Sequence, residues 1–290
     1  MGNQLKSLGY KTVAYHNHTH TYYRRNLSHP NMGYDYKGVG SGLELPRNVW
    51  PNSDLDMMQV TMDEYINNQP FHAYYMTVSG HLEYNFGGNA MAALNREYVE
   101  HLPYSTANKA YIACNMELDK ALEYMMKRLN EAGIAESTVI VLSTDHYPYG
   151  LDGTNGISEF LGHQVDPNFE LFQNNLIIYV QGMEPVTIDK PSSSLDIIPT
   201  ISNLMGLEFD SRFLMGRDIL SNSDPLVIFA NRSFITDKGR RIRDGEFIPN
   251  PGVTVDENYI DNIRRLIDAK FTASTGILDT DYYRIVFENR

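Results

Sequence analysis

Runs of apolar, β-branched or aromatic residues recur along the first two-thirds of the chain and predict four strands. Each run is bounded by turn residues. Several read as continuous apolar sequence, which is typical of strands buried within a sheet. The expected strands cover residues 12–15, 73–78, 138–142 and 176–180.

Helical segments fill the intervals between these strands. Ser53 stands three residues before an acidic residue, the spacing of a capping box. Residues 106–132 place their apolar side chains and Cys114 on one helix face, and Gly133 follows as a stop signal. A third helix is expected at 197–205. Strands that alternate with helices predict an α/β fold, a three-layer sandwich with a mostly parallel sheet.

The pattern changes after residue 221. Short strands are expected at 226–230, 233–236 and 243–248, followed by a helix at 255–271. We interpret this as a small α+β subdomain of antiparallel strands and a helix. The predicted domains are therefore an α/β core, 1–222, and a C-terminal subdomain, 223–290. The basic run from Lys238 to Arg243 is expected to be the solvated edge of a hairpin.

Composition narrows the class of protein. The formal net charge of −12 argues against a nucleic-acid partner, because phosphate binding needs a basic face. The single cysteine, Cys114, excludes a disulfide within the monomer and is expected to be a buried thiol. No apolar run approaches the roughly 20 residues of a membrane span, so we expect the chain as given to be soluble.

Polar residues follow three of the four predicted strands, and ligands of open α/β sheets bind beyond the C-terminal ends of strands. The first segment contains the alternating histidines His16, His18 and His20 and the adjacent Arg24 and Arg25. Imidazoles suit a transition metal, and guanidinium groups pair with phosphate or sulfate oxygens. A metal cluster, an anion or hydroxyl site, and a set of solvent-exposed histidines are all compatible with this pattern.

Two further loops carry candidate chemistry. His81 follows a predicted strand and a glycine that lets the backbone approach a ligand; a structural histidine is the alternative. Asp145 and His146 end a buried strand and form a mixed oxygen and nitrogen donor set suited to Mn or Zn; a turn cap with an exposed histidine is the alternative. For Asp196 we favour a helix N-cap, because Pro199 then falls in the first turn.

Taken in chain order, these elements resemble the alkaline phosphatase superfamily, in its branch of lipoteichoic acid synthases, phosphoglycerol transferases and sulfatase-like proteins. The resemblance covers about residues 9–220. It is carried by Gly9-Tyr10-Lys11-Thr12 leading to His16, Tyr22-Tyr23-Arg24-Arg25, Gly33-Tyr34-Asp35, the loop at His81, Asp145-His146, Ser194 to Thr200 with Asn203-Leu204-Met205-Gly206, and Met215-Gly216-Arg217-Asp218-Ile219-Leu220.

The resemblance implies a role for several positions. Asp145 and His146 would bind a catalytic divalent metal, with manganese favoured and zinc, calcium or magnesium as alternatives. The residues that would contact a phosphoglycerol head group are His16, His18, Tyr23, Arg25 and His81. This chain departs from the synthases at three of these loop positions, with His18 in place of an aspartate, Tyr23 in place of a tryptophan, and Arg24 in place of an asparagine.

The resemblance also implies a reaction. The full-length protein would be a metal-dependent hydrolase or transferase for phosphate or sulfate esters, with phosphoglycerol-type transfer in cell-envelope polymer synthesis favoured. Its partner would be a wall-polymer or glycolipid precursor, and it would be extracytoplasmic and membrane-anchored through an N-terminal segment. The nucleophile and a further acidic ligand are expected upstream of this chain, which alone should be inactive with an incomplete metal site. The alternative is a non-catalytic module that binds an anion or glycolipid head group.

Overall fold

The chain folds into two compact units, Met1–Glu184 and Pro185–Arg290. This computed structural model describes residues 1–151, 153 and 155–288. The boundary expected after residue 222 falls inside the second unit. Within the described residues, no helix is both long enough and apolar enough to cross a bilayer.

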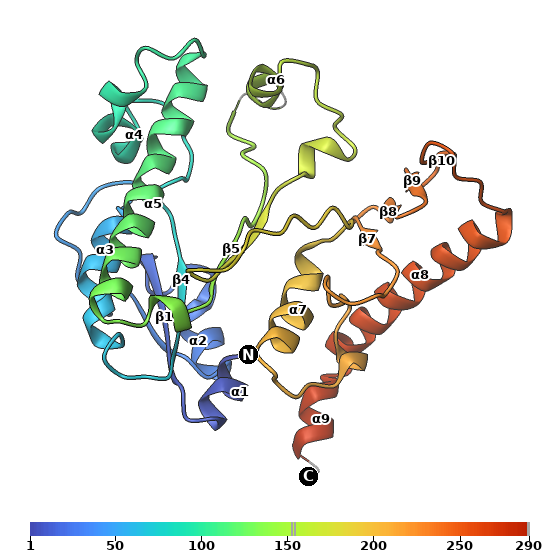
Figure 1. Ribbon diagram of the computed structural model, residues 1–290, viewed down its shortest axis with the longest axis horizontal. Coiled ribbons are helices and arrows are strands. Elements are labelled where there is room, and N and C mark those ends of the chain that lie inside the picture. Colours follow the sequence, from blue (N-terminus) through green and yellow to red (C-terminus); the bar gives the residue numbers. More distant parts are fainter. Residues whose placement is uncertain (152, 154, 289–290) are drawn as a thin grey trace. The chain divides into compact units, whose positions relative to one another are not determined.

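A four-stranded parallel sheet lies at the centre of the first unit (Figure 1). Its strands, in the order β3-β2-β1-β4, are β1 (Lys11–Thr19), β2 (Asp35–Val39), β3 (Gly42–Leu43) and β4 (Phe71–Met76). The sequence predicted β1 and β4 but not β2 and β3. Asp35, Lys37 and the nearby glycines interrupt the apolar pattern there, and only pairing with β1 reveals the strand.

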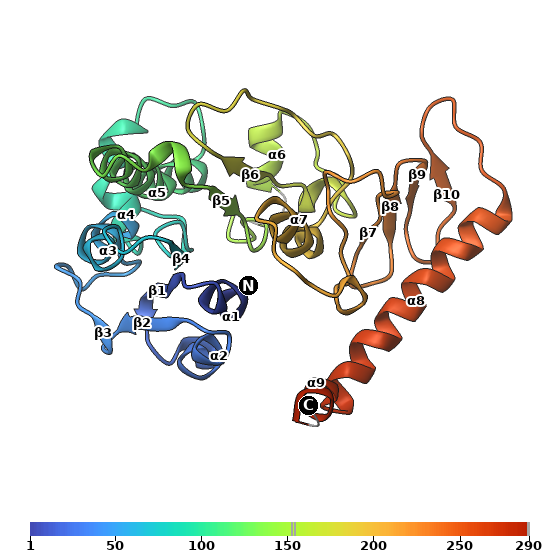
Figure 2. The ribbon, with the colours of Figure 1, turned by 60° about the horizontal axis from the view of Figure 1, so that its bottom comes forward.

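Helices cover both faces of this sheet, which confirms the predicted α/β layering. Figure 2 shows α3 and α5 on one side of the strands and α1 and α2 on the other. The helices of this unit are α1 (Gly2–Ser7), α2 (Arg25–Asn31), α3 (Asp54–Thr61), α4 (Ala90–Leu94), α5 (Thr106–Glu131) and α6 (Asn155–Leu161).

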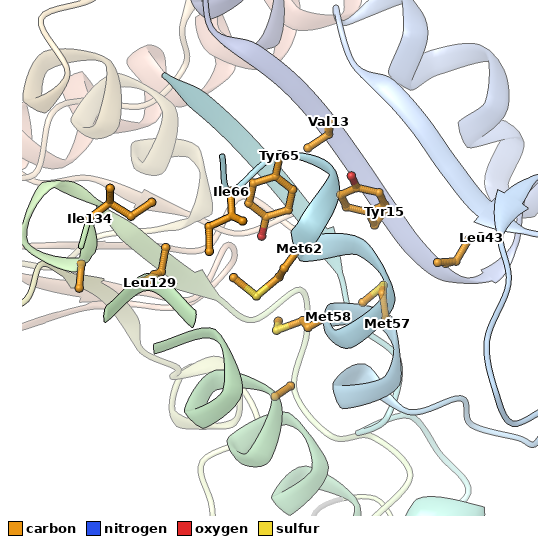
Figure 3. Close-up of a cluster of buried hydrophobic side chains, with 12 residues drawn as sticks. Val13, Tyr15, Leu43, Met57, Met58, Met62, Tyr65, Ile66, Leu129 and Ile134 are labelled. Carbon is orange, nitrogen blue, oxygen red and sulfur yellow. The ribbon is translucent and has the colours of Figure 1, made fainter. Parts of the chain in front are cut away.

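The core follows from the alternation of side chains along β1. Tyr15 is fully buried on the face that packs against Met57 and Met58 of α3, together with Leu129 of α5 (Figure 3). The preceding side chain, Ala14, belongs to a smaller cluster on the opposite face. β1 therefore contributes side chains to the apolar clusters on both faces of the sheet.

The predicted parallel sheet includes β1 and β4 but not the other two predicted strands. β5 (Ile140–Ser143) and β6 (Leu176–Tyr179) pair with each other, antiparallel, in a separate two-stranded sheet. Val141 lies opposite Ile178 in this pair. The prediction that β5 is a buried strand is also wrong, because neither strand of this pair has a buried residue and Val141 and Ile177 are 37% and 52% exposed. An apolar run predicted these strands but carried no information about their partner, direction or burial.

The predicted helix signals in this unit are confirmed. The Ser53 hydroxyl accepts a hydrogen bond from the Asp56 backbone N–H at 3.0 Å and caps α3. Cys114 is completely buried on the inner face of α5. Gly133 follows this helix with φ of +69°, a left-handed conformation that glycine adopts without a steric penalty.

The second unit contains an antiparallel sheet, the long helix α8 and the shorter helices α7 and α9. Its strands, in the order β10-β9-β8-β7, are β7 (Val227–Ile228), β8 (Phe234–Thr236), β9 (Gly239–Arg241) and β10 (Phe247–Pro249). Its helices are α7 (Ile197–Leu204), α8 (Glu257–Asp279) and α9 (Tyr282–Glu288). The meander and α7 were predicted closely, whereas the final helix is longer than expected because nothing after Phe271 stops it.

Two details of this unit differ from the sequence prediction. Most of the basic run is exposed, but β9 within it lies between β8 and β10 and is not an edge strand. Asp196 has the expected structural role by a different route, because its carboxylate accepts hydrogen bonds from the backbone N–H groups of Ser193 at 2.8 Å and Arg217 at 2.7 Å. The Ser193 side chain forms the capping box with it.

Candidate anion-binding site

The site begins where the adjacent parallel strands β1 and β4 end. His16, on β1, is only 4% exposed, and its Nδ1 lies 2.8 Å from the carbonyl oxygen of Met76, the last residue of β4. A carbonyl only accepts, so Nδ1 carries the proton. This bond holds the imidazole in one orientation at the end of the sheet.

Arg25 completes the assignment of the His16 tautomer. Its Nη1 lies 2.9 Å from His16 Nε2. A guanidinium has no acceptor, so Nε2 must accept the bond and His16 is neutral. Burial, the largest cause, and the charge of Arg25 lower the pKa of His16 to about 4. His16 therefore positions a permanently charged guanidinium without neutralising it, and among the described residues no carboxylate pairs with Arg25.

An unusual turn carries Arg25 back toward β1. Tyr23 and Arg24 have φ values of 50° and 55°, a left-handed conformation that is uncommon for residues other than glycine. Two consecutive residues of this kind cost on the order of 1–3 kcal/mol each, and such strain concentrates at functional sites. The Arg25 guanidinium lies 5.5 Å from the Tyr22 ring centre and 5.4 Å from that of Tyr23. The strained turn thus sets one cation beside two aromatic rings.

A continuous row of aromatic rings extends from Arg25 to His81. Tyr22 stacks on His18 with a centroid separation of 4.2 Å. Trp50 packs edge-to-face with both His18 and His81, at centroid separations of 5.1 Å and 5.2 Å. We refer to His16, His18, Tyr22, Tyr23, Arg25, Trp50 and His81 as the histidine–arginine row. It joins the loops after β1 and β4 to the segment before α3.

The two outer histidines of the row have different hydrogen-bonding capacity. His18 Nδ1 accepts from the Thr19 backbone N–H at 2.6 Å, so its proton is on Nε2 and that nitrogen is a donor. His81 Nδ1 lies 2.9 Å from the Leu82 carbonyl and must donate to it, so the Nε2 of neutral His81 is an acceptor. The row therefore offers donors at the Arg25 and His18 end and an acceptor at the His81 end.

A fully buried carboxylate, that of Asp54, joins the two segments that carry the histidines of this row. Asp54 accepts hydrogen bonds from the backbone N–H of Val78 at 2.9 Å, from Asn17 Nδ2 at 2.8 Å, and from both the backbone and the hydroxyl of Ser79. Burial raises the pKa of Asp54, and these bonds oppose the rise. Because Asn17 lies between His16 and His18 and Ser79 precedes His81, Asp54 sets the spacing of the two loops.

Asp145 and His146 follow β5, on a loop that packs against the His81 loop. Gly150 lies so close to Leu82 and Tyr84 that a Cβ there would be 3.0 Å from each side chain. His146 Nε2 is 3.6 Å from Asp145 Oδ1, and the Asp145 side chain is 91% exposed. No hydrogen bond or ring contact in the described part of the chain joins this pair to the histidine–arginine row.

The donor chemistry of this pair suits a divalent cation. His146 Nδ1 lies 2.7 Å from the Tyr147 carbonyl, which accepts a hydrogen bond from the Nδ1–H group, so Nε2 is the basic nitrogen. Metal-binding histidines commonly hold their second nitrogen in this way. The pair supplies only two ligands, and the described residues contain no group of three or more His, Cys, Asp or Glu that could hold a metal.

The structure brings all five predicted substrate residues into one connected row. Their roles, and those of Asp145 and His146, stay predictions. The sequence reasoning missed the contributions of Trp50 and Asp54. Trp50 is the only tryptophan of the chain and stands in a polar segment, a signal that could have marked it. Asp54 gave no such signal, because it sits beside a helix cap among other acidic residues.

Three histidines with lowered pKa values predict a loss of stability in mild acid. Burial lowers the pKa of His16 and of His72 to about 4, from 6.5, and lowers the pKa of His29 as well. A depressed pKa means that the folded state holds the neutral form, so its stabilising contribution is complete above pH 6.5 and is lost as the pH falls toward 4. The free energy of unfolding should therefore decrease steadily over this interval.

Urea titrations followed by Trp50 fluorescence would measure this, since the only tryptophan lies in the first unit. His72→Gln removes one titrating group and keeps an acceptor for the Tyr34 hydroxyl, 3.0 Å from His72 Nε2. It should flatten the decline. His101→Gln, at an exposed position, is the matched control and should leave the slope unchanged. A pH-independent stability between 6.5 and 4.5 in the unmodified chain would contradict the prediction.

Comparison with known families identifies the fold and the broad class. The profile of the sulfatase family matches residues 1–207. The chain belongs to the sulfatase family. The predicted membership of the alkaline phosphatase superfamily, in its lipoteichoic acid synthase-like branch, is confirmed.

Relatives of this sulfatase-family chain include lipoteichoic acid synthases. Lipoteichoic acid synthase 2 of Bacillus subtilis (strain 168) is 23% identical over 289 residues, which cover 97% of this chain and 44% of the relative. The lipoteichoic acid synthase-like protein YvgJ of the same organism is 25% identical, over 81% of this chain and 39% of its own length. The chain thus spans less than half the length of these curated relatives.

Solved structures support the fold of this family member. The crystal structure of the lipoteichoic acid synthase LtaP from Listeria monocytogenes superposes with a TM-score of 0.71 at 19% identity, and the match covers 94% of this chain and 72% of that chain. A protein in the alkaline phosphatase superfamily from Vibrio parahaemolyticus gives a TM-score of 0.63 at 16% identity, covering 95% of this chain and 68% of that chain. At these identities the likeness shows the fold alone.

Proposed function

We propose that the protein of which this chain is part transfers or hydrolyses a phosphate or sulfate ester, with phosphoglycerol-type transfer in cell-envelope polymer synthesis favoured. The lipoteichoic acid synthases among its relatives support this class. The observation that carries the proposal is Arg25, a cation held by neutral His16 at the ends of β1 and β4 and left without a carboxylate partner among the described residues. An anion is the ligand that such a group binds best.

Arg25, His18 and His16 each contribute differently to binding the transferred anionic group. Arg25 offers a planar fork of N–H donors to the phosphoryl or sulfuryl oxygens. His18 adds a donor through Nε2. His16 keeps the guanidinium in place, and because its own pKa is about 4 it stays neutral across the physiological range. In the transition state these preorganised donors would offset the charge that develops on the transferred group.

We further propose that Asp145 and His146 hold a divalent cation, with manganese favoured over zinc, calcium or magnesium. When bound, such a cation supplies a Lewis acid that polarises a phosphoryl oxygen and lowers the pKa of a nucleophile. The nucleophile, a threonine forming a covalent intermediate, and a further acidic metal ligand are proposed to come from outside residues 1–290. Extracytoplasmic location and a membrane anchor belong to the same proposal for the longer protein.

The metal part of this proposal predicts weak binding by the chain alone. Two protein donors seldom hold Mn²⁺ tightly, because stable sites need three or four. Calorimetric titration with Mn²⁺ should show weak binding that Asp145→Ala removes. Asp166→Ala, at another loop carboxylate of the first unit, is the control. Tight binding that survives Asp145→Ala would place the cation elsewhere and contradict the assignment.

The second candidate is a non-catalytic module that binds an anionic or glycolipid head group. It is favoured by the fact that the histidine–arginine row is complete within this chain and needs no metal for its geometry. Turnover of a phosphoglycerol donor by the longer protein, lost on replacing Asp145, would support the enzyme. Ligand binding without any turnover by the longer protein would support the module.

A further inference from the structure

Trp50 is a large aromatic residue whose position hydrophobic packing does not explain. Its side chain is 40% exposed, and none of the buried apolar clusters in the described part of the chain includes it. Its ring neighbours are two imidazoles, His18 and His81. A half-exposed indole between two polar rings contributes little to the core, so its placement calls for another reason.

The backbone around Trp50 is fixed from two directions. On the β1 side, Asn52 Nδ2 donates to the Asn17 carbonyl at 2.8 Å, and Asn17 Nδ2 donates to the Asn52 carbonyl at 3.3 Å. Both amides are buried, and Asn17 lies between His16 and His18. This reciprocal pair holds the Trp50 segment in register with the histidines of β1.

The other anchor leads to His81. The Trp50 carbonyl accepts a hydrogen bond from the Ala90 backbone N–H at 2.9 Å, and the adjacent Asn89 donates from Nδ2 to the His81 carbonyl at 2.9 Å. Trp50 and His81 are thus each tied to one of two adjacent residues at the start of α4. The indole is preorganised between the two ends of the row, an arrangement that lowers the cost of binding a ligand.

The order of groups along the row suits a ligand with two chemically different parts. Arg25 and His18 supply donors, which an anion requires, whereas the neutral form of His81 supplies an acceptor at Nε2, which suits a hydroxyl group. Trp50 lies between His18 and His81 and offers apolar surface. An inorganic anion would use only the first part of this row. An ester of a small hydroxylated alcohol would use all of it.

We infer that Trp50 determines specificity in this site, selecting phosphate or sulfate esters of small polyols over inorganic anions by packing against the carbon chain of the alcohol. The inference rests on the proposed function, which already favours a phosphoglycerol-type group, and adds to it the residue that recognises the organic part of the ligand. Arg25 binds the anionic part of the ester. Trp50 contacts the carbon chain of the alcohol, and His81 accepts a hydrogen bond from its hydroxyl group.

The test compares glycerol phosphate with inorganic phosphate by calorimetry. The unmodified chain should bind glycerol phosphate more tightly. Trp50→Ala should weaken glycerol phosphate about tenfold, equivalent to about 1.4 kcal/mol, and change inorganic phosphate less than about twofold. Trp50→Phe keeps a ring and should retain most of the preference. Tyr98→Ala, which removes an exposed ring packed on Lys120, is the matched control and should change neither affinity.

The outcomes separate this inference from the proposal beneath it. Equal losses for both ligands in Trp50→Ala, or no loss for either, would overturn the specificity role and leave anion binding intact. Failure of the unmodified chain to bind either ligand would overturn the proposed function as well. If Trp50→Ala does not fold, the unmodified chain can be titrated with each ligand instead, and the fluorescence of its only tryptophan is recorded. A change with glycerol phosphate but not with inorganic phosphate supports the inference, and the same response to both overturns it.

Discussion

Replacing Arg25 with alanine should weaken glycerol phosphate binding by about 1.5–3 kcal/mol, the usual worth of a hydrogen bond to a charged group. The unmodified chain is expected to bind this ligand weakly but measurably. The loss should be large because the guanidinium is already oriented by His16 at 2.9 Å and is not shared with a carboxylate in the described part of the chain. Its bonds to the ligand are therefore charge-assisted and partly desolvated.

The measurement is calorimetric titration of the unmodified chain and two arginine variants. Arg25→Lys keeps the charge but loses the planar fork, so its affinity should fall between those of the other two. Arg96→Ala is the matched control, because Arg96 also contacts an aromatic ring, Phe86, but pairs with Glu100 and does not touch the row. Unchanged affinity in Arg25→Ala would mean that the anion binds elsewhere, and the site assigned here would then be wrong.

Asp54→Ala should reduce the free energy of unfolding of the first unit by more than about 3 kcal/mol. The substitution leaves two buried backbone N–H groups, those of Val78 and Ser79, and the Asn17 amide without their acceptor. Each buried donor left unpaired costs about 1–3 kcal/mol. Because these donors lie beside His16, His18 and His81, glycerol phosphate affinity should fall together with stability.

Denaturant unfolding followed by Trp50 fluorescence reports on this unit alone. Asp63→Ala provides the comparison, since Asp63 also accepts from a basic group, Arg128, but its side chain is 73% exposed. An exposed ion pair contributes at most about 1 kcal/mol, so that variant should remain close to the unmodified chain. A similarly small effect of Asp54→Ala would show that the two loops do not depend on this carboxylate for their spacing.

The two variants address different parts of the same arrangement. Arg25 tests contact with the ligand, whereas Asp54 tests the support that places the contacting groups. Arg25→Ala should reduce stability much less than Asp54→Ala, because Arg25 is half-buried and gives up one side-chain hydrogen bond, to His16, whereas Asp54 is fully buried and accepts several. A loss of binding that far exceeds the loss of stability in one variant, and losses of both in the other, would distinguish a binding residue from a positioning residue.

The sequence by itself determined the elements that local patterns encode. Apolar runs marked β1, β4, β5 and β6, and the spacing of Ser53, Cys114 and Gly133 located the caps and buried face of two helices. Motif order along the chain was sufficient to indicate the family. These features depend on residues close in sequence, or on a linear order, and neither requires knowledge of which distant segments meet.

Only the tertiary structure decided how those elements combine. Pairing revealed β2 within a polar, glycine-containing segment and set β5 against β6 in a sheet of their own. The neutral state of His16 follows from the Met76 carbonyl and the Arg25 guanidinium, 60 and 9 residues away in the chain. The place of Trp50 between His18 and His81 depends on hydrogen bonds from Asn17 and Ala90. A contact between distant segments has no local signature, because its free energy is realised only when the chain has folded and both partners leave water together.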